Sequence, residues 1–597
     1  MGPVVRQIDR RATMAKKKSS QKNRPGRTTP RKERNEVTDL VREHIDPRAP
    51  SAVPLREMMR ELLDSEGFEA ARPMIPNATP FIHDTDERPA FDGDLRGKDA
   101  YDALISIHDH FVRKTGDLVQ GLGTAEWLFW LRRLRGQFAI VNNNPSTEPY
   151  VQQVAEALVT QTVRKSESIL DSEHNYAIDE NKLHLLAGLH AVATEVYELH
   201  SLIKRCGKGQ SIRFTPKQLP TWVPDPALDA AIKRYDRRTR EDEAGYFAAL
   251  GIVSAPTTFE GVQLPLGGHV PLWGSTDSAS LRTFTMPDPP PYLPESINLD
   301  PIQALHPGEP LDESQVALIA LLSACYAAIG APPRENAGQR MTSMVQWGYA
   351  LLHTEGTIIP NLESTVEEML RNPGAALASS PQLHSATEVL DVLSTLSSEI
   401  YSPLAGNPVH PVGVWSLIDL VGASRRLMRT LTRPRTGNVR PWTEQFERDV
   451  QAIVDQSPWR PDDNVRDGLV GRNIDRNDGS ELTDIDAVAM RGDRLLLISC
   501  KSYPLTREEQ RGDFRIVPTQ LNRASEALTK WNSVVDYVRR NPRALGVELP
   551  PDIEIDGCVV APFVPYNTDP DGERRVFGTF PVLLSASELE RALQQRP

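Results

Sequence analysis

Apolar residues recur every three or four positions through the first part of the chain. Examples are Leu104, Ile107 and Phe111, then Trp127, Trp130, Leu131 and Leu134, then Val151, Val154, Ala155 and Leu158. This spacing places apolar side chains along one face of a helix. Residues 38–206 are therefore predicted to form a helical domain, whose last helix covers residues 183–202 and ends near Gly207.

The pattern changes between residues 207 and 310. Proline-rich runs at residues 219–224 and 286–291 enclose one charged helical stretch, residues 229–250. Proline fixes φ and removes a backbone donor, so such runs interrupt regular structure. We predict a Pro-rich irregular linker or subdomain over this range.

Helical periodicity returns over residues 311–432, with a break rich in Pro, Gly and Asn at residues 402–411. We predict a second helical domain that ends at the run 433–437, which contains Pro and Gly. The longest apolar run, residues 316–331, lies inside this domain. Because it is shorter than the roughly 20 residues needed to cross a bilayer, we interpret it as a buried helix.

A different pattern begins at Pro441. Phe446, Val450 and Ile453 have helical spacing, and Thr443 is a suitable residue to cap the start of the helix. Strand-like runs follow at residues 468–474, 483–490 and 495–500.

Short turns join these strand-like runs. The tight turn at residues 491–494 predicts that the second and third strands pair as a hairpin. Strands near residues 557–563 and 580–584 and a closing helix at residues 586–593 complete the pattern. We therefore predict a multidomain chain with a mainly α-helical N-terminal region. Its C-terminal domain, residues 441–597, is predicted to be α/β, with a central mixed sheet flanked by helices.

Composition agrees with a folded chain of several domains. Its 597 residues exceed what one hydrophobic core organises, and 39% of them are hydrophobic against 25% charged. The net charge is -12, yet residues 1–37 carry twelve Lys or Arg and three Asp or Glu, so the remainder is near -21. We expect residues 1–37 to be a disordered basic tail, which either contacts phosphate groups or only aids solubility.

The chain shows no secretory or membrane-spanning segment. No apolar leader opens it, and its four cysteines are scattered. We therefore expect a cytoplasmic, reduced protein without a membrane partner, and we expect no structural zinc.

The first 430 residues carry few signs of catalysis. They lack phosphate-binding, dinucleotide-binding and hydrolase motifs. His108 and His110 alternate along a helix and so face different directions, and we predict that His184, His190 and His200 are packing residues. We expect this region to be a scaffold, a ligand sensor or a surface for a protein partner.

The predicted hairpin carries a group of charged residues. Asp484 and Asp486 alternate along its first strand and should share one face, as should Ser499 and Lys501 near the end of its second strand. Pairing across the turn brings Asp486 towards Lys501. Phosphodiester hydrolysis needs carboxylates to hold a divalent metal and a cation to orient water or stabilise charge on phosphate.

The segments 481–488 and 495–501 together resemble the signature of the PD-(D/E)XK restriction-endonuclease-like nucleases. The resemblance covers roughly the last 155 residues. It implies a nuclease fold that uses Mg²⁺ or Mn²⁺ bound by Asp486 with Asp484 or Glu447. It also implies that Lys501 and Gln520 are catalytic residues, and that the leading helix supplies Glu447, with Glu444 as the substitute.

One position departs from the family pattern, because Ser499 stands where the second acidic residue is expected. Three explanations remain open. Another element, such as Glu447 or Glu481, supplies the carboxylate; Asp484 and Asp486 hold the metal with the Cys500 carbonyl; or the domain binds without cutting. The Cys500 thiol is expected to face the buried side of the strand.

These observations predict a metal-dependent nuclease, with DNA expected ahead of RNA and the helical region used for recognition or regulation. A role in restriction or defence is compatible with this architecture by analogy. One alternative is a degenerate nuclease fold that binds nucleic acid or a protein partner without cleavage. Another is a helical scaffold whose C-terminal domain is incidental.

Overall fold

The computed structural model describes the chain in separate stretches between Phe91 and Gln594. The described residues are 91–120, 122–133, 148–161, 180–216, 218–249, 253–254, 269–275, 293–298, 310–330, 348–373, 375–378, 380–400, 404–431, 439–475, 481–502, 509, 511–564, 566–568 and 574–594. The predicted basic tail of residues 1–37 lies outside them, as do residues 38–90 of the first predicted domain.

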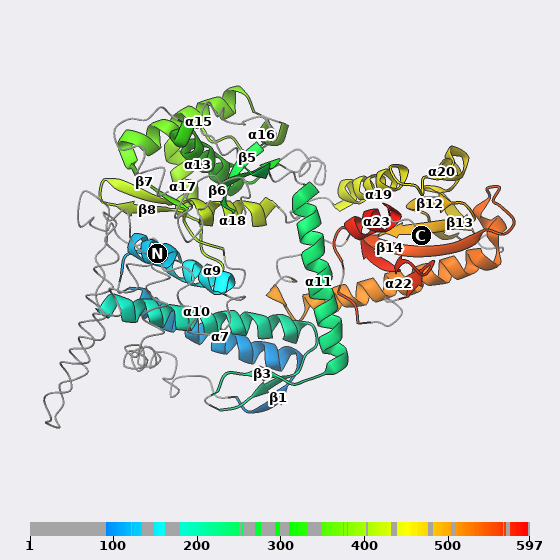
Figure 1. Ribbon diagram of the computed structural model, residues 1–597, viewed down its shortest axis with the longest axis horizontal. Coiled ribbons are helices and arrows are strands. Elements are labelled where there is room, and N and C mark those ends of the chain that lie inside the picture. Colours follow the sequence, from blue (N-terminus) through cyan, green and yellow to red (C-terminus); the bar gives the residue numbers. More distant parts are fainter. Residues whose placement is uncertain are drawn as a thin grey trace, which may run out of the picture.

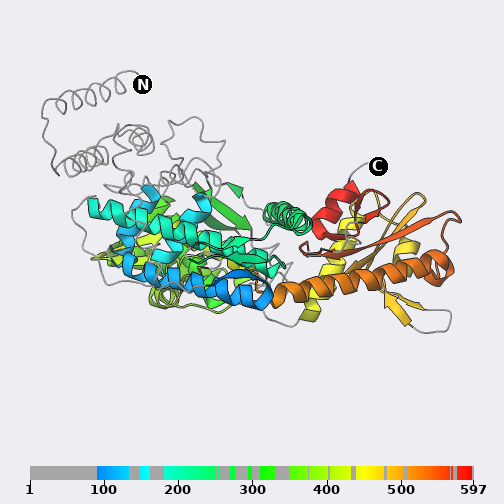
Figure 2. The same ribbon diagram turned by 90° about the horizontal axis from the view of Figure 1, so that it is seen from below.

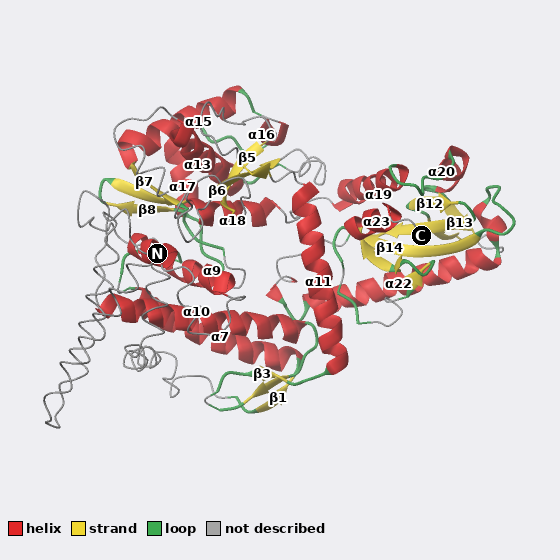
Figure 3. Ribbon diagram, viewed as in Figure 1, coloured by secondary structure: helices red, strands yellow, loops and turns green. Residues whose placement is uncertain are grey.

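The described part mixes helices with several small sheets (Figure 3). Figures 1 and 2 show an N-terminal body and a C-terminal domain, with helix α11 (Pro226–Ala249) running between them. Within the described residues, no helix has the combined length and apolar character that crossing a membrane requires.

Long helices form one part of the N-terminal body. They are α7 (Gly97–Val119), α8 (Thr124–Arg133), α9 (Glu148–Val159) and α10 (Glu180–Gly207). Their apolar stripes meet in one core that contains the buried Leu104, Phe111, Trp127, Trp130 and Leu158, as the periodicity predicts. A small antiparallel sheet lies beside them, with the order β1 (Gly93–Leu95), β2 (Ile212–Phe214), β3 (Thr221–Trp222).

The histidines of these helices are mostly packing residues, as predicted. His108 on α7 and His200 on α10 are buried, and their Nε2 atoms lie 3.2 Å apart. His190 is buried as well. The His184 side chain lies outside the described residues.

The range predicted as a Pro-rich linker contains regular structure. Its charged stretch forms α11, as predicted from the sequence. A second small sheet, in the order β4 (Val253–Ser254), β6 (Leu293–Asn298), β5 (His269–Ser275), was not predicted.

The second predicted helical domain contains strands as well as helices. Its described helices are α13 (Glu313–Gly330), α15 (Ile359–Arg371), α16 (Ala375–Ala378), α17 (Ala386–Ser394), α18 (Leu420–Leu431) and the π-helical turn η3 (Thr354–Ile358). The strands β7 (Tyr349–His353), β8 (Val409–Val412) and β9 (Trp415–Asp419) form an antiparallel sheet in the order β7-β9-β8. Most of α13 is buried, which explains its apolar composition and confirms the predicted buried helix.

A buried ionic network joins the two halves of the N-terminal body. Arg132 of α8 donates two hydrogen bonds to Glu156 of α9, at 2.6 and 2.8 Å, and one to Asp419 of β9 at 2.9 Å. Arg425 of α18 donates to Glu156 at 2.9 Å. Burial alone would raise the pKa of Glu156, but Arg132 and Arg425 outweigh it and lower that pKa to about 2.

A mixed sheet forms the centre of the C-terminal domain. The strand order is β12 (Ala487–Arg491), β13 (Arg494–Cys500), β14 (Glu554–Ala561), β17 (Leu583–Ser585). The pair β12–β13 is antiparallel, and β13–β14 and β14–β17 are parallel. Smaller pairs are β10 (Asn473–Asp475) with β11 (Glu481–Asp484), and β15 (Arg575–Val576) with β16 (Phe580–Pro581).

Helices cover this sheet on both sides. They are α19 (Val439–Asp455), α20 (Asp463–Leu469), α22 (Ile516–Arg540), η4 (Pro542–Leu545) and α23 (Ala586–Gln594). Figure 1 shows α19 and α23 together above the sheet and α22 below it. Gly557 of β14 lets α22 pack closely, because a methyl group there would lie 2.4 Å from a Val535 methyl carbon. The domain is therefore α/β, as predicted.

The predicted hairpin is present and turns at Gly492, whose φ of +61° favours glycine. The predicted closing strand and helix are also present, but three details of the C-terminal prediction are wrong. Helix α19 begins at Val439, so Thr443 does not cap it. The run 468–474 begins inside helix α20, and the run 483–490 is divided between β11 and β12.

Candidate active site

The carboxyl end of β13 lies between two neighbouring strands. The register pairs Ile498 with Ala487 of β12 and Cys500 with Val560 of β14. Beyond the strand, the Lys501 N–H donates to the Val560 carbonyl at 2.8 Å, so the parallel pairing continues for one more residue. This pairing fixes the backbone of Lys501 at the edge of a buried sheet.

Asp484 and Asp486 do not share one strand face, contrary to the prediction. Asp484 ends β11, which pairs with β10, whereas β12 begins only at Ala487. Between them Ile485 is buried and forms a parallel bridge with Val470, which interrupts the alternation. Asp484 is exposed, and Asp486 turns towards β13.

Asp486, Ser499 and Lys501 form a connected polar chain. The Lys501 ammonium donates to the Ser499 hydroxyl at 2.8 Å, and that hydroxyl donates to Asp486 Oδ2 at 3.2 Å. The Cys500 N–H also donates to Oδ2, at 2.5 Å, and Lys501 Nζ lies 3.9 Å from the same oxygen. Ser499, which occupies the position where an acid was expected, therefore links the carboxylate to the lysine.

Electrostatics around Asp486 leave the carboxylate under-neutralised. Burial raises the pKa of Asp486 above its usual value, and Lys501 and the Cys500 N–H offset this only in part. No described residue donates a hydrogen bond to its other oxygen, Oδ1.

Glu447 of α19 is the second carboxylate of the group. Burial raises its pKa to about 7, and the neighbouring negative charges of Asp486 and Asp484 contribute to the shift. Glu444, the substitute considered from the sequence, is exposed and contributes less to this shift. The structure therefore places Glu447, Asp486 and Lys501 within electrostatic range of one another.

The pKa of Glu447 predicts how stability depends on pH. Between about pH 4.5 and pH 7 the folded protein keeps a proton on Glu447 that the unfolded chain releases, so the free energy of unfolding should fall as pH rises through this window. Urea unfolding of the metal-free protein at several pH values measures this slope. Glu447→Gln should flatten it, whereas Glu526→Gln, at an exposed position of α22, should not. An unchanged slope in Glu447→Gln would show that Glu447 titrates normally.

Two carboxylates of the group, those of Glu447 and Asp486, are close enough for their charges to interact. The residues that the structure describes contain no group of three or more His, Cys, Asp or Glu side chains able to hold a metal. Mg²⁺ is commonly bound through one or two carboxylates, with waters and substrate phosphates completing the shell. Glu447 and Asp486, both with raised pKa values, fit a site of that kind because a dication would neutralise their combined charge.

The structure bears on the three explanations for a serine, Ser499, at the position of the expected acid. Glu447 lies on another element, α19, and its charge interacts with that of Asp486, which agrees with the first explanation. The Cys500 carbonyl accepts from Lys501 Nζ at 2.9 Å, which occupies one of its acceptor positions. The Glu481 side chain lies outside the described residues.

Gln520, the fourth predicted catalytic residue, lies on α22. It lies in the second turn of α22 and is 7% exposed, and its Oε1 atom is buried without a hydrogen-bond partner. Among the described residues, no hydrogen bond joins Gln520 to Glu447, Asp486 or Lys501. The sequence predicted its helix, and its role beside the lysine stays a prediction.

Sequence reasoning missed a contact between α19 and the end of β13. The Thr443 hydroxyl lies 2.9 Å from the Ser502 hydroxyl, so Thr443 connects α19 to the residue after Lys501 instead of capping the helix.

Cys500 is buried, as predicted, and burial raises the pKa of its thiol well above the ordinary value. A thiol in that state is a poor nucleophile.

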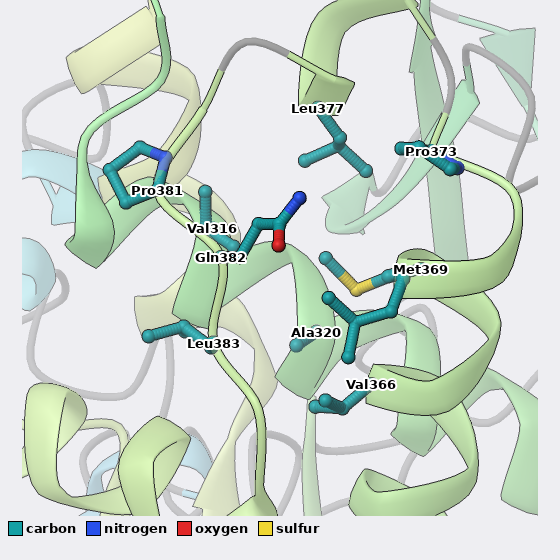
Figure 4. A pocket seen from close by; sticks show the side chains of 10 residues that line it. Val316, Ala320, Val366, Met369, Pro373, Leu377, Pro381, Gln382 and Leu383 are labelled. Carbon is teal, nitrogen blue, oxygen red and sulfur yellow. The ribbon is translucent and has the colours of Figure 1, made fainter.

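A second polar cluster and an apolar pocket are less suited to catalysis. At the opposite end of β14, Asp556 accepts from Arg539 at 2.6 Å and from Arg574 at 2.9 Å, so its charge is already neutralised. Figure 4 shows a hollow in the N-terminal body lined by side chains without an ionisable group. The residues around it are Val316, Ala320, Val366, Met369, Leu370, Pro373, Leu377, Pro381, Gln382 and Leu383.

Comparisons of the chain with protein-family models, with curated proteins and with solved structures found no match. The arrangement of Glu447, Asp486, Ser499 and Lys501 is therefore the main basis for assigning a function.

Proposed function

We propose that the C-terminal domain is a metal-dependent nuclease of the restriction-endonuclease-like type, acting on DNA ahead of RNA. The observation that carries this proposal is the chain from Lys501 through Ser499 to Asp486, together with the raised pKa of Glu447. An ammonium next to two under-neutralised carboxylates is the set of groups that phosphodiester hydrolysis requires.

Each residue has a separate task in this proposal. Asp486 and Glu447 would hold Mg²⁺ or Mn²⁺, and Glu447 would release its proton when the ion binds. The ion would polarise the phosphate and lower the pKa of the attacking water. Lys501, held by Ser499 and the Cys500 carbonyl, would orient that water or stabilise negative charge on the phosphate.

The surrounding fold supports the same proposal. Helix α19 carries Glu447, the β12–β13 pair carries Asp486 and Lys501, and α22 follows before the parallel strand β14. This order of elements agrees with the resemblance found in the sequence. We propose a cytoplasmic setting, because the four cysteines are buried free thiols.

The second candidate is a nuclease fold that binds nucleic acid or a protein partner without cutting. Ser499 in place of an acid, and a site limited to two carboxylates, favour it. Such a protein would retain nucleic acid in a salt-dependent way and would leave it intact in every metal.

Lys501→Ala tests the nuclease proposal. With saturating Mg²⁺, its cleavage rate should fall about 100- to 1000-fold, because one stabilising cation is lost from the reaction centre. Binding of the uncut substrate in Ca²⁺ should remain within severalfold of wild type, as measured by fluorescence anisotropy.

Lys530→Ala is the matched control, since Lys530 is an exposed lysine on α22 of the same domain. It should cut at the wild-type rate. Equal rates in Lys501→Ala and Lys530→Ala would remove Lys501 from the proposed mechanism.

A further inference from the structure

The end of α10 contacts the segment that leads into α22. A methyl group at Gly207 would lie 2.2 Å from the Gly512 carbonyl oxygen, and one at Gly512 would lie 2.5 Å from Lys204 Cα. The φ of Gly512 is +78°, which also favours glycine. Two glycines thus allow the backbones of the N-terminal body and the C-terminal domain to touch.

Neighbouring residues of this segment are also held by the N-terminal body. The ring of Phe514 lies 5.1 Å from that of Tyr101 on α7. Arg511 forms an ion pair with Glu399 at 3.5 Å. Asp513 accepts the first backbone hydrogen bonds of α22, from Ile516 and Val517, so the contacts fix the residues at which α22 begins.

Helix α11 packs on the first turns of α22. Ile232 of α11 is buried together with Val517 of α22 and Tyr566, and Leu521 packs against this cluster. The Tyr566 hydroxyl donates to the Lys208 carbonyl at 2.9 Å, which ties the cluster to the end of α10. Leu521 is the residue next to Gln520, so this contact sets the position of Gln520 as well.

Helix α11 also contacts the edge of the sheet that carries Lys501. Arg238 donates to the Leu583 carbonyl at 2.7 Å and to both carboxylate oxygens of Glu588. Leu583 is the first residue of β17, and β17 pairs with the segment of β14 whose Val560 carbonyl accepts the Lys501 N–H. The views in Figures 1 and 2 agree in placing the start of α22 next to α11.

We propose that the end of α10 and helix α11 form a dock that positions the start of α22 and the carboxyl edge of the sheet, and thereby controls the candidate active site. The proposal rests on the proposed nuclease function. Gly207 and Gly512 are positioning residues in it, because they act through α22 and do not touch the reacting groups. The contacts of Arg238 and Tyr566 stabilise the docked arrangement.

Gly207→Ala in the full-length chain tests this dock. Alanine favours the helix more than glycine, so α10 itself should not be weakened, but the methyl group must push the backbone at Gly512 away. Gly116→Ala is the matched control, because Gly116 lies in α7 and a methyl group there meets nothing within 4 Å.

The first measurement is the single-turnover cleavage rate with enzyme in excess, which does not depend on the fraction of protein that is folded. Gly207→Ala should lower this rate about tenfold or more, because a small misplacement in a reaction centre is costly. Gly116→Ala should stay within twofold of wild type. Tyr566→Phe, which removes only one hydrogen bond of the dock, should cause a smaller decrease.

The second measurement is hydrogen exchange of the amides in residues 516–525, which does not require activity. Exchange there should be faster in Gly207→Ala than in Gly116→Ala. If wild type cuts nothing, the nuclease proposal fails and this measurement alone decides whether the dock exists. Equal exchange in the two variants, or equal cleavage rates when wild type is active, would overturn the proposal.

Discussion

Asp486→Asn should lower metal-dependent cleavage about a thousandfold or more. The carboxylate is mostly buried and is one of the two proposed to hold the metal, so removing its charge should remove most of the stabilisation that a bound dication gives the transition state. The asparagine oxygen can still accept the Cys500 N–H, so the fold should persist. Single-turnover cleavage at saturating Mg²⁺ measures the effect.

Asp467→Asn is the control for this result. Asp467 is an exposed aspartate of the same domain, near the end of α20, and its carboxylate accepts a hydrogen bond from Arg466. It should cleave at the wild-type rate and bind Mg²⁺ equally well in calorimetry. If Asp486→Asn also kept wild-type activity, the reacting metal would have to be bound elsewhere.

Glu156→Ala should lower the free energy of unfolding by about 3–5 kcal/mol. Arg132 is 1% exposed, and without Glu156 it would lose two hydrogen bonds to a buried carboxylate, while Arg425 would lose one. An under-compensated buried charge is strongly destabilising. Urea unfolding near pH 7 measures the loss.

The surface pair Arg213–Asp94 provides the control for Glu156→Ala. It has the same two-pronged geometry, with distances of 2.8 and 3.0 Å, but both side chains are about half exposed. Asp94→Ala should leave stability nearly unchanged, because exposed ion pairs contribute little. A similar loss in both variants would mean that burial does not determine the strength of the Glu156 network.

The pH dependence of the Glu156 contribution follows from its lowered pKa. The stability that it provides should be complete above about pH 4.5 and should disappear as pH falls towards about 2. The free energy of unfolding should therefore rise with pH because of Glu156, whereas it should fall with rising pH because of Glu447. The two carboxylates are thus distinguished by their surroundings, one neutralised by arginines and one crowded by other acids.

Much of the fold could be predicted because helical periodicity reflects burial directly. The core residues of α7, α8 and α9 and the long helix α10 follow from spacing alone. The strands β7, β8 and β9 did not, because short apolar strands next to buried helices have no distinct period. The run 483–490 is divided into two strands because Ile485 forms a bridge with Val470. Alternation along one strand does not reveal such a contact.

The sequence proposes the residues of the candidate site but does not show the geometry that connects them. Asp486 and Lys501 were selected because strand pairing should bring them together, and Glu447 because the resemblance implies a glutamate from the leading helix. The role of Ser499 as a link between them depends on side-chain geometry that spacing does not encode. Contacts of α10 and α11 with the start of α22 join segments far apart in the sequence, so local periodicity does not show them.

The measurement that tests the nuclease proposal most directly is cleavage by the full-length wild type. Single- and double-stranded DNA and RNA should each be incubated with Mg²⁺, with Mn²⁺ and with a chelator, and activity should be followed across a gel-filtration peak. The nuclease proposal predicts cleavage that requires metal, stops when the chelator is added and coincides with the protein peak. Folded protein that cuts none of these substrates in either metal, or cutting that persists in the chelator, would contradict it.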